Sequence, residues 1–497
     1  MAKMGEAVVS DAHHQLFEQQ ERRMEQITEM WRNFPTRDAS GKETILGYGE
    51  VPGGRLHFLE GLEKGSLKEK HVAQCLHNTY VWLRGLSEAT RMTNVGEWEK
   101  FAFPIVSAVM GNLVAEDLVS VQPLDQPNGR IFFKNGTFGT TKGNITRGQK
   151  MYDYQTGPST ATDYTSEKVN QEAIWTATGL TANVVGTLAW RPCRAGTITI
   201  TDGTQVVQDN GNGVFVGDIG AGNNSIDYGS GNYDVTFAVA PAAGLAVTAT
   251  YEYDMEGYTA LPEVDLSISS ESVVARPRGM RARWSMESMY ALKSLHGLDA
   301  EAEQTNMMVN WLAYELNRTI IAHLFAIANN GLTTWDRTPP AGVQWYFHKQ
   351  SLIDAFQGAS GRIFRSTQGA LGNWVIVGVN VGNVLVTLEK FKGNGVKFDP
   401  EKVRGIVKVG TIDSISQMDV YWDPTIGEND FLIGHKGGWL DTGYVWAPWL
   451  PAYTVPTYFL DDMMGRKAMK SMTAQKVINN RMYARGQMTQ SGGEFAP

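Results

Sequence analysis

The sequence predicts an α+β protein in which a small all-β domain is inserted into a mixed host domain. Three observations support this prediction. Apolar residues recur at helical spacing within 285–329, short runs in 174–258 alternate as strands do, and glycine is abundant at 53 of 497 residues. A chain of this length can form several hydrophobic cores.

The N-terminal third is expected to be mainly helical. Residues 11–34 are polar, with a thin apolar stripe that is too narrow to drive folding alone, so this helix is expected to dock on another part of the protein. An extended arm at 35–65 and helices at 66–88 and 97–120 are expected to follow. The stripe consists of Leu16, Met24, Ile27 and Trp31.

The middle of the chain has the pattern of a β-sandwich. Ile198 and Ile200 alternate with threonines, and Asn210-Gly211 is a hairpin signal of the type that tolerates positive φ. Strand alternation is also seen in Val235, Phe237 and Val239, and again in Val247, Ala249, Tyr251 and Tyr253. The inserted module is therefore expected to span about 174–258.

The longest helical pattern follows this module. A continuous helix over 285–329 would reach about 60 Å at 1.5 Å per residue, unless Gly297 interrupts it. Its apolar face is Met308, Trp311, Leu312, Leu316, Ile320 and Leu324. Farther on we expect a buried strand and then a helix in 374–388, strands at 403–409, 418–422 and 430–435, and a basic, partly helical segment at 466–485.

Composition narrows the class of protein. Apolar residues make up 42% and charged residues 19%, as in globular proteins, and no apolar run approaches the ~18 residues of a membrane span. The N-terminus lacks the features of a signal peptide, so we expect the chain to stay in the cytoplasm where it is made. Cys75 and Cys193 are expected to be free, buried thiols.

Catalytic and metal-binding motifs are missing from the sequence. It contains no GxxxxGK[ST] loop, no HExxH and no GxSxG elbow, and its histidines are scattered. The run Asp209-Asn210-Gly211-Asn212-Gly213 is only distantly similar to a calcium loop, and a tight hairpin is the favoured interpretation. We therefore expect no catalytic residue, no cofactor and no metal.

Two segments carry a specific resemblance. Residues 94–133, with the run VQPL at 121–124, and residues 264–318, with LKSLHGLDAEAE followed by LAYELNR, resemble major capsid proteins of the T-even type of tailed bacteriophage. These segments cover about a fifth of the chain and stand in the family's order.

The resemblance implies the Hong Kong 97-like phage capsid fold, with the all-β domain inserted in the extended E-loop. Ile131–Phe138 and Leu266–Arg283 would be the two E-loop strands. The implied organisation is an N-terminal arm and helices (1–96), the start of the peripheral domain and E-loop (97–150), the E-loop β insertion domain (151–262), the return strand and spine helix (263–349), the axial domain (350–460) and a C-terminal segment (461–497).

The implied function is structural. Copies of the chain would assemble into hexamers and pentamers of an icosahedral or prolate head shell, which encloses double-stranded DNA without sequence-specific binding and touches no membrane. Portal, scaffold and decoration proteins are the other implied partners. The protein would reside in the virion after assembly in the bacterial cytoplasm. Leu86-Ser87-Glu88 fits the pattern that a prohead protease cuts in relatives, but we expect the N-terminus to be retained.

Charged and aromatic residues are the candidate intersubunit contacts. The acids near 299 also fit the first turn of a helix after Gly297, which is the favoured interpretation. The arginines near 280 fit either phosphate or an acidic neighbouring subunit, and the second is favoured. The candidates are Trp31, Arg276, Arg278, Arg281, Arg283, Asp299, Glu301, Glu303, Trp446 and Trp449.

Three alternatives remain open from the sequence. An encapsulin-like compartment shell would share the fold and would differ in holding a cargo-binding site. Another virion part, such as a tail or decoration protein, would form tubes or bind only preformed shells. A carbohydrate-binding or hydrolytic enzyme with a β-sandwich module would need a paired-carboxylate site, and no such pair stands out.

Overall fold

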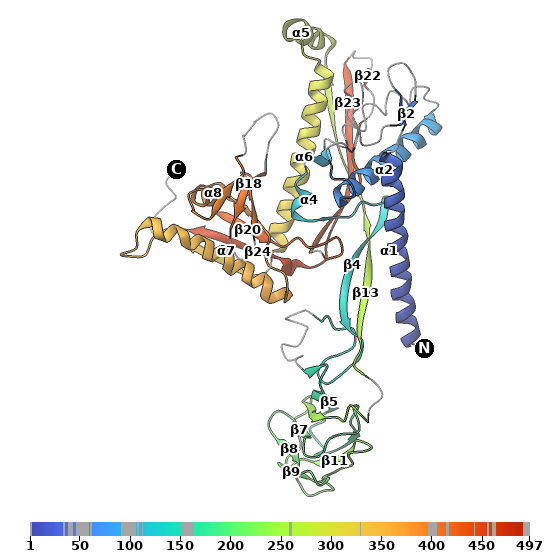
Figure 1. The fold of residues 1–497 in the computed structure, drawn as a ribbon, viewed down its shortest axis with the longest axis vertical. Coiled ribbons are helices and arrows are strands. Elements are labelled where there is room, and N and C mark those ends of the chain that lie inside the picture. Colours follow the sequence, from blue (N-terminus) through green and yellow to red (C-terminus); the bar gives the residue numbers. More distant parts are fainter. Residues whose placement is uncertain are drawn as a thin grey trace. The chain divides into compact units, whose positions relative to one another are not determined.

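The computed structural model divides into two compact units of mixed α+β and all-β structure (Figure 1). Unit 1 comprises Met1–Lys134 and Ile268–Pro497, and unit 2 comprises Asn135–Ser267. The structure describes residues 2–32, 35–37, 43–45, 59, 62–90, 106, 109–111, 113–151, 163–257, 261–328, 330–395, 405–413, 417–441, 443–454, 457–459 and 464–490. Within these ranges, no helix has the length and apolarity needed to span a membrane.

Two N-terminal helices, α1 (Ala2–Arg32) and α2 (Leu67–Thr90), pack on each other, as expected for a thin apolar stripe. The Arg32 guanidinium lies 2.5 Å from the fully buried carboxylate of Glu69. Leu16 was expected in the stripe of α1 but is 43% exposed. Two helical turns span about 7.2 residues, so Phe17, seven residues before Met24, takes its place. The buried stripe is Phe17, Met24, Ile27 and Trp31.

The segment between α2 and the first sheet is only partly described. Of the expected helix at 97–120, the described portion contains the short helix α4 (Ala115–Leu118), and much of the remainder lies outside the described residues. The expected arm at 35–65 contributes two short strands that pair antiparallel, β1 (Pro35–Arg37) and β2 (Glu43–Ile45).

A five-stranded sheet in unit 1 has the order β14-β23-β21-β3, with β22 also pairing with β23. Residues 466–485 were expected to be partly helical. The segment forms most of β23 and the start of β24, and its helical content is a single 3-10 turn at Asn480–Met482, so this prediction is wrong for most of the segment. In β23, buried and more exposed residues alternate from 465 to 473, which is the period of a strand. The strands are β14 (Arg276–Trp284), β23 (Gly465–Val477), β21 (Tyr444–Thr454), β3 (Ser120–Val121) and β22 (Tyr458–Phe459).

Two helices follow β14, namely α5 (Met286–His296) and α6 (Ala300–Ile327). Gly297 separates them, since its φ of 65° ends α5 in the left-handed region. The Asp299 side chain then caps α6 by accepting the Glu301 N–H at 3.0 Å. The interruption at Gly297 is thus confirmed, and the 28 residues of α6 span about 42 Å. Trp311 does not belong to the buried face of α6, because it is 57% exposed.

A seven-stranded sheet forms a second core of unit 1, in the order β15-β24-β20-β16-β19-β18-β17. The expected strand and helix in 374–388 are confirmed as β16 (Trp374–Val377) and α8 (Val379–Leu385), and helix α7 (Trp345–Thr367) packs on the same core. The other strands are β15 (Leu332–Asp336), β24 (Tyr483–Thr489), β20 (Asp430–Gly434), β19 (Met418–Trp422), β18 (Val407–Ile412) and β17 (Phe391–Gly393).

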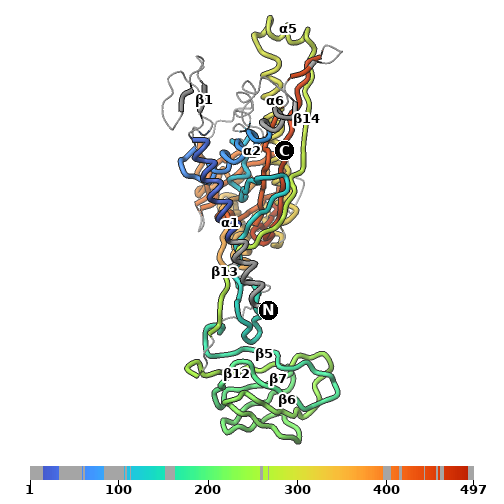
Figure 2. The backbone as a smooth tube through the Cα atoms, turned by 90° about the vertical axis from the view of Figure 1, so that its right-hand side faces the viewer, coloured from blue at the N-terminus to red at the C-terminus, as the bar shows by residue number. Residues whose placement is uncertain are grey.

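Unit 2 contains a β-sandwich whose backbone Figure 2 traces. A five-stranded sheet, β5-β12-β7-β8-β9, and a three-stranded sheet, β10-β11-β6, contribute to one shared core. The strands are β5 (Lys168–Thr176), β6 (Asn183–Thr187), β7 (Thr199–Thr201), β8 (Val206–Asp209), β9 (Phe215–Gly217), β10 (Ser225–Ile226), β11 (Asn232–Thr236) and β12 (Ala246–Glu252).

The expected strand alternations of unit 2 are largely confirmed. Val247, Ala249, Tyr251 and Tyr253 are all buried, whereas Val239, expected to continue the alternation of Val235 and Phe237, is 68% exposed. The Asp209–Gly213 run forms the turn between β8 and β9, so the hairpin interpretation is confirmed. The Asp209 carboxylate accepts the N–H groups of Gly196 and Gly211, at 2.5 and 3.0 Å.

Two long strands join the units along the chain, β4 (Asn128–Phe138) and β13 (Val264–Val274), and they pair with each other (Figure 1). The expected return strand Leu266–Arg283 is divided at Ala275. Before this residue the chain pairs with β4, and after it, as β14, it pairs with β23. One continuous extended segment therefore belongs to two sheets.

Candidate assembly surfaces

The side chains of β14 divide between two faces of its sheet. Arg278 lies on the face that α6 covers, where its guanidinium is 2.9 Å from Glu315 Oε1 and 3.1 Å from Thr319 Oγ1. Arg276 has the same parity and is exposed near the start of the strand. The ion pair with Glu315 occupies Arg278 within the chain, so Arg278 is a stabilising residue of unit 1.

The opposite face of β14 and β23 is basic. Arg281 and Arg283 are exposed there, and the strand register places Arg283 directly opposite Arg466 of β23, and Gly279 opposite Lys470. We call Arg281, Arg283, Arg466 and Lys470 the basic face. Arg466 and Lys470 were missed in the sequence, because only the pairing of β14 with β23 brings them beside the other two.

The three acids around 299 have separate roles. Asp299 caps α6, which confirms the helix-start interpretation. Glu301 lies within the chain's own contacts, 3.0 Å from Lys467 Nζ and 2.7 Å from Thr457 Oγ1. Glu303 is exposed in the first turn of α6, where its charge is favourable to the helix dipole. Of the three acids, Glu303 is therefore the one that remains a candidate for contact with another subunit.

The tryptophan candidates lie inside unit 1. Trp31 and Trp446 have no exposed surface, and both belong to the large core that α6 and the five-stranded sheet share. Trp449 is half-buried against a smaller core, and its carbonyl oxygen accepts a hydrogen bond from Asn78 Nδ2 at 2.9 Å. Trp31 and Trp446 therefore serve the chain's own packing, and we keep neither as a candidate surface residue.

Helix α5 is an unexpected exposed element. None of its eleven residues is buried, although it is capped at both ends. Short helices in water are marginal without tertiary packing, so this exposure is typical of a surface that another molecule covers. No sequence signal separated it from a core helix, because its apolar residues have ordinary helical spacing. Large apolar side chains exposed on and after α5 are Tyr290, Leu295, Leu298, Met307 and Trp311.

No cluster of three or more potential metal-ligating side chains occurs within the described part of the chain. The surfaces above present charge and apolar area. Residues 95–495 match the family model described as major capsid protein Gp23.

The chain belongs to the Gp23 family of major capsid proteins. The major capsid protein of Enterobacteria phage T4 is 23% identical over 372 residues, which cover 70% of this chain and 68% of that protein. The major capsid protein of Vibrio phage KVP40 is 25% identical over 210 residues, 38% of this chain and 40% of that protein. Among solved structures, the capsid of Myoviridae phage XM1 is 8% identical, with a TM-score of 0.30, and covers 64% of this chain and 89% of that chain.

This Gp23 family member is a structural subunit of the head shell of a tailed phage, and its place is the virion capsid. It is not an enzyme. The resemblance at 94–133 and 264–318 is confirmed, since both segments lie almost wholly within the matched range. Copies of the chain assemble with one another into the shell.

Proposed function

We propose that this Gp23 family member builds its shell with the Hong Kong 97-like fold. In this proposal β4 and β13 form the E-loop, and unit 2 is the insertion domain carried by it. Helix α6 is the spine of the peripheral domain, and the seven-stranded sheet is the core of the axial domain. The observation that carries the proposal is the path of the chain from β13 through β14 and the short helix α5 into the capped helix α6.

The six segments expected from the sequence remain the proposed organisation, with one refinement. The seven-stranded sheet takes β15 from 332–336 and β24 from 483–489, so the proposed axial domain draws strands from both sides of 350–460. The compact unit Asn135–Ser267 similarly encloses the proposed insertion domain 151–262.

Hexamers and pentamers of the chain would form an icosahedral or prolate shell around double-stranded DNA. Weak contacts between many copies add up in such an assembly, so each interface can be modest. Portal, scaffold and decoration proteins are proposed as further partners. We propose no sequence-specific contact with DNA, because the basic face carries four cations on a sheet and offers no helix to a groove.

The basic face is proposed as an intersubunit contact that receives an acidic surface of a neighbouring copy. The exposed Arg281 and Arg283 give this face a positive charge that an acidic surface of a neighbouring copy would attract, which steers association and makes it depend on salt. Glu303 and α5 are proposed as further contacts, on the strength of their exposure.

The test is charge reversal on one strand. The double variant Arg281→Glu/Arg283→Glu should remain folded, because both side chains are exposed, and should form no closed shells in negative-stain micrographs of the expressed full-length protein. Arg276→Glu, on the same strand but the opposite face, is the matched control and should still assemble. Normal shells from the double variant would refute the role of the basic face. Tubes, or no particles, from the wild-type chain would refute the proposed shell as well.

A further inference from the structure

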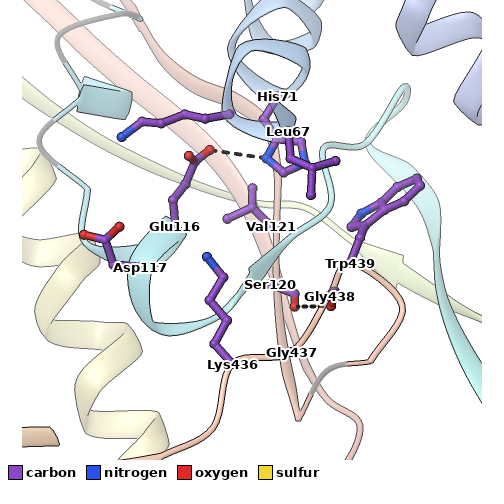
Figure 3. A pocket seen from close by; sticks show the side chains of 11 residues that line it. Leu67, His71, Glu116, Asp117, Ser120, Val121, Lys436, Gly437, Gly438 and Trp439 are labelled. Atoms are coloured by element: carbon purple, nitrogen blue, oxygen red, sulfur yellow. Dashed lines mark hydrogen bonds and ion pairs between the residues drawn. The ribbon is translucent and has the colours of Figure 1, made fainter. Parts of the chain in front are cut away.

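A pocket of about 250 Å³ in unit 1 is lined by a balanced set of charges. Its lining brings Lys68 and Lys436 together with Glu116 and Asp117, and His71 Nδ1 lies 3.3 Å from Glu116 Oε1 (Figure 3). Two lysines facing two carboxylates favour no ion of either sign. Uncompensated charges and exposed apolar side chains occur together instead on the outer side of α6.

A single stripe along α6 combines these exposed side chains. Successive residues of a helix are about 100° apart, so positions 303, 307, 314 and 318 lie within about 30° of one line along the helix, and 310 and 311 within about 50° of it. Met307 is 69% exposed and Trp311 57% exposed, and both residue types are enriched at protein interfaces. We call the following six residues the α6 stripe: Glu303, Met307, Asn310, Trp311, Tyr314 and Arg318.

The two charged residues of the α6 stripe lie at its two ends. Glu303 and Arg318 are both exposed, and neither forms an ion pair with any residue that the structure describes. They are separated by about 22 Å along the helix, so they cannot pair with each other within one chain. Each charge is therefore available to another molecule.

The order of residues in the α6 stripe is self-complementary. When two copies lie antiparallel with a two-fold axis at the middle of the stripe, residues at equal distances from the axis face each other. Glu303 then faces Arg318 of the second copy, at both ends of the pair, and Met307 faces Tyr314 of the second copy. The two copies of Trp311 meet beside the axis. A two-fold interface requires this property, because one patch has to bind its own copy.

We propose that the α6 stripe binds the α6 stripe of a second copy, antiparallel, across a two-fold axis of the shell. The apolar side chains would lose contact with water at the centre, and the charges at the ends would fix the direction of pairing. The proposal rests on the proposed shell. A stable dimer buries about 1,200–2,000 Å², and Met307 and Trp311 supply roughly a few hundred, so the pair is expected where many contacts act together.

Cross-linking in assembled shells of the full-length chain tests the geometry. Asn310 lies beside the axis, so Asn310→Cys should form disulfide-linked dimers as the main product of mild oxidation, read on a non-reducing gel. Ala322→Cys is the matched control, exposed on the same helix, and should give no dimer because the symmetry places its two copies about 35 Å apart. The native Cys75 and Cys193 are buried and should add no background.

Charge exchange tests the register. Glu303→Arg and Arg318→Glu should each lower the melting temperature of the shells by about 2 °C, because either change places like charges opposite each other. The double variant should melt above Glu303→Arg alone, although it carries one more substitution, since its reversed charges attract again. The helix dipole disfavours a cation at position 303 equally in both variants. Within one chain the positions are too far apart for this rescue, so it requires a second copy.

Each failure has a separate meaning. Shells of Asn310→Cys without dimers would overturn the pair and leave the proposed shell standing. If that thiol were also protected from maleimide, another protein or another part of a neighbouring copy would cover the α6 stripe. A double variant whose loss equals the sum of the two single losses would overturn the antiparallel register. Absence of particles from the wild-type chain would overturn the proposed shell and this pair with it.

Discussion

The two units of this capsid protein differ in net charge and in how far apart in the sequence their contacting residues lie. Unit 2 contains 6 Lys and Arg against 14 Asp and Glu, a net charge of −8. The whole chain has 44 and 52, so unit 1 keeps 38 of each and is neutral. The entire net charge of the chain thus resides in about a quarter of its residues. Because net charge affects solubility and association, the two units are expected to respond differently to added salt.

The two units also differ in the sequence separation of the residues that contact each other. Among the described residues, the sandwich core of unit 2 is built from side chains that lie between 169 and 255. In unit 1, by contrast, β3 pairs with β21 through Ser120 and Val445, and β15 pairs with β24 through Leu332 and Arg485. Unit 2 is local in sequence and unit 1 is not. We therefore expect unit 2 to fold on its own, whereas unit 1 depends on contacts between distant parts of its sequence.

The largest expected effect comes from removing unit 2. Replacing residues 140–262 by Asn-Gly should leave unit 1 folded, because Gly139 N and Glu263 O are already hydrogen-bonded at 2.8 Å and a two-residue hairpin can close there. Calorimetry of the wild type should show two transitions, and the deletion should abolish one of them. A single transition in the wild type, or an unfolded deletion variant, would contradict the independence of the units.

The next effect tests whether the two cores are separate. Phe215 and Phe356 are almost fully buried, in the cores of unit 2 and unit 1 respectively. Phe215→Ala should lower the free energy of unfolding of unit 2 by about 3–5 kcal/mol and leave unit 1 unchanged. Phe356→Ala should do the reverse. Calorimetry distinguishes the two, and a shift of both transitions by either variant would show that the units are coupled.

A smaller effect is expected at Lys142, the buried cation of unit 2. Its ammonium donates to three carbonyl oxygens and lies 5.1 Å from the ring centroid of Tyr253. Lys142→Met leaves these oxygens unsatisfied and should therefore lower the free energy of unfolding of unit 2 by about 2–3 kcal/mol. The contributing carbonyls belong to Asp163, Tyr164 and Ser166.

The pH dependence of the same site has a definite sign. Burial lowers the pKa of Lys142 from 10.5 to about 8. Between these two values the unfolded chain binds more protons than the folded one, so the contribution of Lys142 to stability rises as pH increases from about 8 to 10.5. The melting temperature of unit 2, taken as wild type minus Lys142→Met, should therefore increase over this range. A flat or falling difference would show that the site favours the charged ammonium.

The smallest effect concerns salt. Self-repulsion within an acidic unit is screened by added ions, so raising sodium chloride from about 20 mM to 500 mM should stabilise unit 2 by about 0.5 kcal/mol. Unit 1 is neutral and should respond less. Both transitions are recorded in one calorimetric scan, so unit 1 serves as the internal control. An equal stabilisation of both units by salt would show that their difference in net charge does not affect their stability.

Sequence reasoning succeeded where local pattern decides structure. The buried run at 374–377 and the helix after it were predicted because an apolar strand bounded by glycine has few alternatives. The break at Gly297 and a helix start after it, with acids in its first turn, followed from residue chemistry alone, whereas the role of Asp299 as the N-cap came from the structure. The alternation of Val247, Ala249, Tyr251 and Tyr253 located the sandwich in the same way.

Tertiary contacts decided what the sequence could not. Residues 466–485 have helix-compatible composition, but their place between β14 and β21 makes most of them a strand. Trp311 fits the helical period of α6 and is nevertheless exposed, because periodicity cannot tell which residues at the border of a face are covered. The basic face could be only half predicted, since Arg466 joins Arg283 through pairing across some 180 residues of sequence.

The hydrogen bond between Gly139 and Glu263 has a consequence for how capsids diversify. Because the two ends of the segment 140–262 lie next to each other, its length can change without moving these ends apart. Peptides or whole domains placed there should leave the register of β4 and β13 unchanged. Foreign epitopes or enzymes grafted at this junction would be repeated in every copy that the shell contains.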